Sequence, residues 1–274
     1  DAQESRGLGD VYKRQILDRN GVVLATNYSA YTLEITPSRA GVLDETIDAL
    51  SKVVDIQARD RRRFKRLMEE SRNFESLPIR TRLTDQEVAR FTAQRYRFPG
   101  VDIKARLFRN YPLGDVASHA IGYIGRINQT EKARIQDSED EANYRGTEYI
   151  GKLGIEHSFE SALHGATGVE QMETSAGGRA VRKLSSHAAT PGDSVMLSID
   201  IKLQKLIEEL YGSRRGALVA IDPRNGEILA LVSKPTFDPN LFVEGIDAEN
   251  WAALNESIDL SLIHISEPTR LLSI

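Results

Sequence analysis

The chain has 274 residues and a formal net charge of −4, and 40% of its residues are hydrophobic. Together with a mean hydropathy of −0.37, this composition indicates one large or two ordinary globular domains and excludes a fibrous or wholly disordered chain. Because cysteine is absent, disulfides, thiolate metal sites and a cysteine nucleophile are excluded. No excess of basic residues indicates a nucleic-acid partner. No apolar run is long enough for a membrane span or a signal peptide.

The two ends of the chain are related at the level of DNA. Residues 10–15 can be encoded by a string whose reverse complement encodes residues 260–265. That string resembles the transposon mosaic end used to prepare sequencing libraries, and residues 266–270 look like its continuation. We therefore expect residues 1–15 and 260–274 to be adapter-like, non-native segments around a natural sequence from residue 16 to 259. Codons that do not form an inverted repeat would contradict this expectation.

The first natural elements are predicted from turn residues and apolar periodicity. Asn20-Gly21 lies between two apolar runs, which is typical of a hairpin, and Thr84 with Glu87 forms a capping box that starts a helix. The expected order is a hairpin over 16–25, a strand over 31–36, helices over 44–54 and 60–71, a strand over 77–83, a helix from 84 that ends before Pro99, and a strand over 101–108.

The helix predicted over residues 60–71 carries a basic cluster made of Arg61, Arg62, Arg63, Lys65 and Arg66. Such a cluster can meet an anionic partner or simply face solvent. Because the acids Asp60, Glu69 and Glu70 interleave with it, the sequence favours a solvated helix face.

The second half of the chain shows a change near residues 191–193, where Pro-Gly-Asp predicts a turn and a domain boundary. Before it we expect a surface loop over 137–149, a helix over 153–163 and a strand over 169–174. After it we expect a strand over 195–199, a helix over 201–211 that Asp200 caps, and an apolar hairpin over 217–221 and 228–232. The helix is expected to turn Leu203, Ile207 and Leu210 inward.

Candidate catalytic and ligand-binding residues are not found by motif. The five histidines, His119, His157, His164, His187 and His264, lack metal-ligand spacing, and we expect His119 to be a structural residue. The glycines Gly125, Gly151 and Gly154 do not form a phosphate-binding loop. Glu208 and Glu209 are adjacent on a predicted helix and should point apart. The sequence alone therefore assigns no catalytic, cofactor-binding or metal-binding residue.

Five segments taken together resemble the class B penicillin-binding proteins. Residues 111–125, which begin Tyr-Pro-Leu-Gly and end Gly-Tyr-Ile-Gly, are similar to the pedestal motif of that family. Residues 151–168, 191–204 and 216–240 look like its following signatures, and residues 16–25 resemble the stretch after its membrane anchor. The details are most like penicillin-binding protein 2, the elongation-specific group, rather than the division-specific one.

The resemblance implies an α+β fold made of two parts. Residues 16–190 are expected to form an elongated, β-rich pedestal domain of the dimerisation type, with a helical head near residues 40–98. Residues 191–259 are expected to be the start of an α/β transpeptidase domain like that of the serine β-lactamases. The apolar hairpin of that second part would lack covering partners, so we expect poor solubility.

The resemblance also implies a function and a place in the cell. The parent protein would be a serine-type D-Ala-D-Ala transpeptidase and carboxypeptidase on the periplasmic face of the bacterial inner membrane, attached through an anchor that this chain lacks. Its substrates would be peptidoglycan stem peptides, and β-lactams would acylate its serine. Its pedestal would bind a SEDS-type glycosyltransferase and a scaffold protein of the elongation machinery. No cofactor, metal or nucleic acid is implied.

One departure from the family pattern limits this expectation. The family nucleophile is the Ser of Ser-x-x-Lys, but no Ser here is followed three residues later by Lys. The segment 152–154, Lys-Leu-Gly, fails the Lys-Thr/Ser-Gly motif, and 71–73, Ser-Arg-Asn, matches Ser-x-Asn only formally. We therefore expect an inactive fragment with no catalytic residue. The alternatives are a stand-alone, non-catalytic pedestal module that binds partners and, less favoured by residues 111–125, a division-type transpeptidase.

Overall fold

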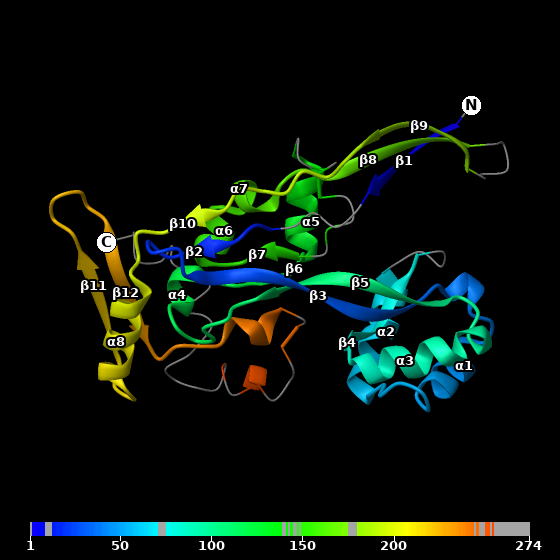
Figure 1. Cartoon of the computed structure of the whole chain (residues 1–274), viewed down its shortest axis with the longest axis horizontal. Coiled ribbons are helices and arrows are strands. Elements are labelled where there is room, and N and C mark those ends of the chain that lie inside the picture. Colours follow the sequence, from blue (N-terminus) through cyan, green and yellow to red (C-terminus); the bar gives the residue numbers. More distant parts are fainter. Residues whose placement is uncertain are drawn as a thin grey trace. The chain divides into compact units, whose positions relative to one another are not determined.

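The computed structural model describes residues 2–8, 13–70, 75–138, 141, 143–144, 147, 149–174, 180–243, 245–246, 250–252 and 254 (Figure 1). The chain divides into two compact units. We call Tyr28–Phe108 the helical unit, and we call Asp1–Asn27 together with Arg109–Ile274 the main unit. Both mix helices and strands, so the predicted α+β class is confirmed.

The helical unit contains the expected helical head. Its elements are α1 (Leu43–Leu50), α2 (Ala58–Glu70), α3 (Asp85–Gln94), most of β3 (Val23–Ile35), β4 (Leu77–Leu83), most of β5 (Val101–Asn110), and the 3-10 turns η1 (Pro37–Arg39) and η2 (Arg95–Arg97). β3 pairs antiparallel with β4 and also pairs with β5. Thr84 and Glu87 form the predicted capping box at the start of α3.

The core of the helical unit lies between the helices and the strands. Phe64 of α2 and Phe91 of α3 are buried in one cluster with Leu33 and Ile35 of β3 and Ile79 of β4. Phe64 and Leu67 therefore mark the face that α2 turns to the core.

The main unit starts with the predicted hairpin. β2 (Ile16–Leu17) pairs antiparallel with the beginning of β3, and β10 (Val195–Met196) pairs in parallel with β2. Gly21 supplies the positive φ of the turn, at 80°. The remaining elements of the unit before β10 are α4 (Ser118–Ile121), β6 (Ile124–Arg126), α5 (Gln129–Gln136), β7 (Tyr149–Gly151), α6 (Gly154–Ser158) and α7 (Glu160–His164).

A separate three-stranded antiparallel sheet is formed by β1 (Ala2–Leu8), β8 (Gly168–Thr174) and β9 (Ala180–His187), with β8 in the middle (Figure 1). β1 falls within residues 1–15, which the sequence predicts to be non-native. The strand forms from backbone pairing, which any sequence without proline can supply. The domain boundaries that the sequence predicts at residues 15–16, 190–191 and 259–260 stay predictions.

The last part of the main unit is a helix and a hairpin. α8 (Ile201–Tyr211) contacts β12 (Ile228–Lys234), which pairs antiparallel with β11 (Gly216–Ile221), and η3 (Pro239–Phe242) follows. As predicted, Asp200 caps α8 by accepting hydrogen bonds from Lys202 and Leu203 N–H. Figure 1 shows α8 alongside the β11–β12 hairpin.

Several predictions of detail are wrong. The helix over 153–163 is two short helices that break at Phe159, and the strand over 195–199 covers only two residues. The strand over 31–36 is the end of β3, which is continuous with the hairpin arm. The sequence predicts none of α4, α5, β6, β7 and β9. In the described part of the chain, no helix has the length and apolar character needed to cross a membrane.

Candidate functional site

The segment 111–125 packs against the segment 235–243 inside the main unit. Tyr111 N–H donates to Asn240 Oδ1 at 3.0 Å, and Asn240 Nδ2 donates to the Tyr111 carbonyl at 3.0 Å. The amide of one side chain thus satisfies both backbone groups of a residue 129 positions away. We call the contacts between the segments 111–125 and 235–243 the junction.

Three further hydrogen bonds extend the junction. His119 Nε2 lies 2.9 Å from the Pro235 carbonyl, which can only accept, so Nε2 carries the proton. Thr236 Oγ1 donates to Asp115 at 2.6 Å, and Phe237 N–H donates to Ser118 Oγ at 3.4 Å. His119 and Ser118 are therefore used in structural contacts, as the sequence predicts for His119.

Aromatic packing covers the same contact. The His119 and Tyr123 rings both meet the edge or face of Phe237, with centroids at 5.2 Å and 6.0 Å. Tyr123 also stacks on Phe242 at 4.1 Å. Burial of the Tyr123 hydroxyl, with the Glu131 carboxylate nearby, raises the pKa of Tyr123. These rings form an aromatic cluster that packs the segment 111–125 against the segment 235–243.

α8 is docked by buried polar groups, which contradicts the predicted inward stripe. Gln204 exchanges two 2.8 Å hydrogen bonds with the Leu231 backbone of β12, and it donates to Glu208 Oε1 at 2.7 Å. Leu210 is 64% exposed, and Leu203 and Ile207 are only half-buried. The contact surface follows Ile201, Gln204 and Glu208 at helical spacing, and hydrogen bonds satisfy the two polar side chains that are buried there.

Glu208 joins α8 to the segment 111–125. Its Oε1 accepts from Ala117 N–H at 3.0 Å, and Ala117 has a left-handed backbone with φ 58°. A left-handed non-glycine residue costs about 1 kcal/mol, and the buried carboxylate holds it in place. Glu209 is exposed, so the two adjacent carboxylates point apart as predicted.

Asp18 ties the first hairpin to the start of α8. Its carboxylate is fully buried and accepts from the N–H groups of Asn20, Val22 and Ile201. Burial opposes the ionisation of Asp18, but these N–H groups outweigh it, so the pKa of Asp18 lies below its usual value. The hairpin signature of the sequence is thus part of the support of α8.

A buried charge cluster contacts Tyr111, the first residue of the segment 111–125. Glu156 is fully buried, and it pairs with Arg109 Nε at 2.7 Å and with Lys13 Nζ at 3.2 Å. Burial opposes its ionisation, but the two cations outweigh it and lower the pKa of Glu156. Tyr111 O–H donates to Glu156 at 3.2 Å, and burial together with that carboxylate raises the pKa of Tyr111. Lys13 belongs to the stretch that the sequence assigns to the adapter.

The glycines of residues 122–154 allow close packing rather than phosphate binding. A Cβ at Gly122 would lie 1.8 Å from the Leu153 carbonyl oxygen, and one at Gly154 would lie 2.5 Å from that of Ala120. The Lys152 ammonium pairs with Glu131 at 2.5 Å, so the segment 152–154 is not an accessible catalytic lysine site.

The other residues singled out in the sequence are not brought together. His157 contacts the Gly151 carbonyl, and His164 is buried against Tyr144. The formal match at 71–73 and His264 lie outside the described residues, as does the side chain of His187. Among the residues that the structure describes, no group of three or more His, Asp and Glu could hold a metal ion.

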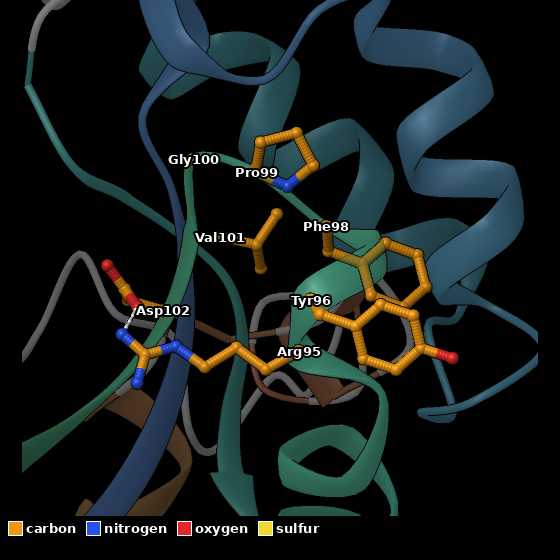
Figure 2. Close-up of a pocket in the computed structure, with 7 residues that line it drawn as sticks. All are labelled: Arg95, Tyr96, Phe98, Pro99, Gly100, Val101 and Asp102. Atoms are coloured by element: carbon orange, nitrogen blue, oxygen red, sulfur yellow. Dashed lines mark hydrogen bonds and ion pairs between the residues drawn. The ribbon is translucent and has the colours of Figure 1, made fainter.

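The helical unit has a shallow hollow of about 480 Å³ beside η2 (Figure 2). Phe98 and Val101 are buried at its base, and Tyr96 is 85% exposed at its rim. Figure 2 shows the Arg95 guanidinium reaching Asp102 across one side, an ion pair of 2.5 Å. Apart from the exposed Tyr96 hydroxyl and Asp102, which this ion pair occupies, its lining offers no nucleophile or general base.

Comparisons with known proteins match two regions of the chain. Residues 13–197 match the penicillin-binding protein dimerisation domain, and residues 216–259 match the penicillin binding protein transpeptidase domain. The peptidoglycan D,D-transpeptidase MrdA of Escherichia coli (strain K12) is 42% identical over 249 residues, which are 91% of this chain and 39% of that protein. Penicillin-binding protein 3 of Bacillus subtilis is 32% identical over 246 residues, 88% of this chain and 35% of that protein.

Two solved structures resemble the fold. The complex between penicillin-binding protein PBP2 and MreC from Helicobacter pylori gives a TM-score of 0.72 at 23% identity, covering 96% of this chain and 48% of that one. Pseudomonas aeruginosa PBP2 in complex with WCK 5153 gives 0.56 at 29% identity, covering 94% and 36%. The chain thus spans about two fifths of the length of the curated relatives that it matches.

Proposed function

The chain belongs to the penicillin-binding protein family, and from that membership we propose that it is the pedestal and the first part of the catalytic domain of a peptidoglycan D,D-transpeptidase of cell-wall elongation. The main support for this proposal is the 42% identity to MrdA over 91% of the chain. The matched transpeptidase region, 216–259, is only the start of that domain.

The proposed reaction is acyl transfer from a stem peptide through a serine ester. The serine attacks the D-Ala-D-Ala carbonyl, D-Ala leaves, and an amine of a second stem peptide takes the acyl group. An oxyanion hole would stabilise the tetrahedral intermediates. Because this chain has no Ser-x-x-Lys, we assign none of its residues to that chemistry and expect it not to react with β-lactams.

The residues present would serve to position the catalytic domain. Asn240 and His119 hold the stretch that follows β12, and Gln204 and Glu208 hold α8. Asn240 and His119 join the two matched regions directly, and α8, which lies between these regions in the sequence, contacts both. We propose that these contacts fix the start of the transpeptidase domain on the dimerisation-type domain. The boundary is proposed at residues 190–191.

A second function, a stand-alone module that binds partners, is favoured by one observation. Two thirds of the chain match the dimerisation domain, and a protein with the same fold is solved in complex with MreC. We propose a scaffold protein of the elongation machinery and a SEDS-type glycosyltransferase as partners, at the periplasmic face of the inner membrane. In this reading the chain binds but does not catalyse.

Genomic sequence beyond Asp259, followed by labelling, separates the two functions. Under the first, the reading frame continues into a Ser-x-x-Lys motif, and the longer product is labelled covalently by fluorescent penicillin while the 274-residue chain is not. An in-frame stop without that motif would favour the binding module. Covalent labelling of the 274-residue chain at a defined serine would contradict our reading of its sequence.

A further inference from the structure

Helix α2 presents four cations that the fold does not use. They are Arg59, Arg62, Lys65 and Arg66, and we call them the basic stripe. All four are exposed, and none forms an ion pair within the described residues. The other two basic residues of α2 are engaged, since Arg61 pairs with Asp48 at 2.6 Å and Arg63 with Asp60 at 3.6 Å.

The acid that was expected to neutralise this helix is turned inward. Asp60 is 4% exposed, accepts from Gln57 N–H at 3.0 Å and lies 3.8 Å from Arg80 of β4. Of the two remaining acids, Glu69 is exposed at the C-terminal end of the stripe. Asp60 therefore does not neutralise the exposed face of α2, and that face is more basic than the sequence pattern indicates.

The stripe has a regular geometry. At 3.6 residues per turn, Arg59, Arg62 and Arg66 lie above one another on the face opposite Phe64 and Leu67, with Lys65 beside them. The rise from Arg59 to Arg66 is about 10 Å. Three guanidinium groups thus repeat at intervals that carboxylates on a facing helix can match.

Charge is also unevenly divided between the two units. Residues 28–108 contain sixteen Lys and Arg and twelve Asp and Glu, a net charge of +4, while the whole chain has −4. The rest of the chain therefore carries −8. An acidic partner is therefore attracted by the helical unit and repelled by the main unit.

We propose that the basic stripe of α2 binds an acidic segment of a protein partner, with carboxylates at helical spacing. Arginine is suited to this because it holds a carboxylate through two parallel hydrogen bonds. α2 exposes no apolar side chain larger than Ala58, so it has no group to stack on a sugar or to enter a lipid layer. This inference does not depend on the transpeptidase assignment.

The test uses the 274-residue chain and a synthetic helical peptide with Glu at positions 1, 4 and 8. A matched peptide has Gln at those positions, and phosphatidylglycerol vesicles represent a lipid surface. The variant R59Q/R62Q/R66Q removes the stripe. The control R90Q/R95Q/R97Q removes the same charge from another surface of the same unit, and R59K/R62K/R66K keeps the charge but not the bidentate geometry. Thermal unfolding checks that each variant is folded.

The Glu peptide is expected to bind at about 50 mM salt and to weaken steeply by about 300 mM, because the contact is electrostatic. The stripe variant should weaken binding about ten-fold or more, and the Lys variant about three-fold, while the control stays within about two-fold. Equal losses in the stripe variant and the control would overturn the proposal. So would binding of the Gln peptide, or tighter stripe-dependent binding to the vesicles than to the Glu peptide.

Discussion

The side-chain amide of Asn240 forms the two hydrogen bonds that a neighbouring strand would otherwise supply to Tyr111. It satisfies both main-chain groups of Tyr111, and Asp238 orients it by accepting from its amide. Buried backbone groups that lose their partners are costly, whereas a partner in place contributes only modestly. The junction is therefore sensitive to this single amide.

Replacing Asn240 by Ala is expected to destabilise the main unit by about 2 kcal/mol, because Tyr111 N–H and C=O are left without partners. Chemical denaturation by urea measures the change. Asn225→Ala, in an exposed turn, is the control and should cost less than about 1 kcal/mol. Equal effects of the two substitutions would show that the Tyr111 contact carries no special stability.

The carboxylate of Asp18 makes stability depend on pH. Its pKa in the folded chain is below the ordinary value of 3.8, so the folded state binds its proton less readily than the unfolded state. The stabilisation is fully present above the ordinary pKa and is lost as the pH falls below it toward the lowered folded pKa. Urea midpoints measured from pH 6 downward should fall less steeply in Asp18→Asn than in the unchanged chain. An unchanged slope would contradict this role.

Contacts of this kind could not be predicted from the sequence. The hairpin of Asn20-Gly21 and the cap of Asp200 depend on neighbouring residues, and the sequence predicted both. Asn240 meets Tyr111 across 129 residues, and no local pattern marks either partner. The family resemblance named the segment 111–125 without saying what it touches.

At the scale of elements, α4 and α6 approach so closely that glycine is required. Gly122 has φ 75° and a Cβ there would clash with Leu153 O. Gly226, in the turn of the β11–β12 hairpin, has nearly the same φ of 76° but open space around it. Gly122 also has ψ −156°, a backbone conformation that glycine alone adopts readily, so a side chain there meets both backbone strain and a steric clash.

Gly226→Ala is expected to cost about 1 kcal/mol, which is the strain of a left-handed residue alone. Gly122→Ala adds the clash and should cost at least about 3 kcal/mol, enough to separate the two helices or unfold the unit. Thermal unfolding and circular dichroism of the two variants measure the difference. Similar melting temperatures would mean that α4 and α6 can move apart without loss.

Element type was predictable where periodicity and turn residues agree, as in α2, β4 and the β11–β12 hairpin. The helix predicted over 201–211 is confirmed as α8, but its predicted inward face is wrong, because the leucines indicated one face and the buried Gln204 and Glu208 define another. Apolar periodicity cannot detect a helix that docks through paired polar groups. For the same reason, the sequence pattern does not show that Asp60 is buried.

At the scale of the whole chain, the β11–β12 hairpin leaves apolar surface open. Val219 is 54% and Ile221 is 57% exposed. Strands of this kind self-associate unless something covers them. The chain by itself is therefore expected to aggregate at micromolar concentration.

The double substitution V219K/I221K should shift the chain toward a monomer, because like charges oppose strand-to-strand pairing. Sedimentation velocity at matched concentrations measures the shift, and V42K, at another exposed apolar residue, is the control. A monomeric unchanged chain with a cooperative melting transition would contradict the expectation.

The parallel pairing of β10 with β2 joins two strands that are synthesised at widely separated times. Ile16 is made early, but its partner Val195 is made 179 residues later. At about 5–20 residues per second, a ribosome takes roughly 10–40 s to add that length. During this interval one edge of β2 has no strand beside it. The N-terminal hairpin is therefore open to wrong pairing during synthesis, and slowing translation between these positions should lower the yield of folded chain.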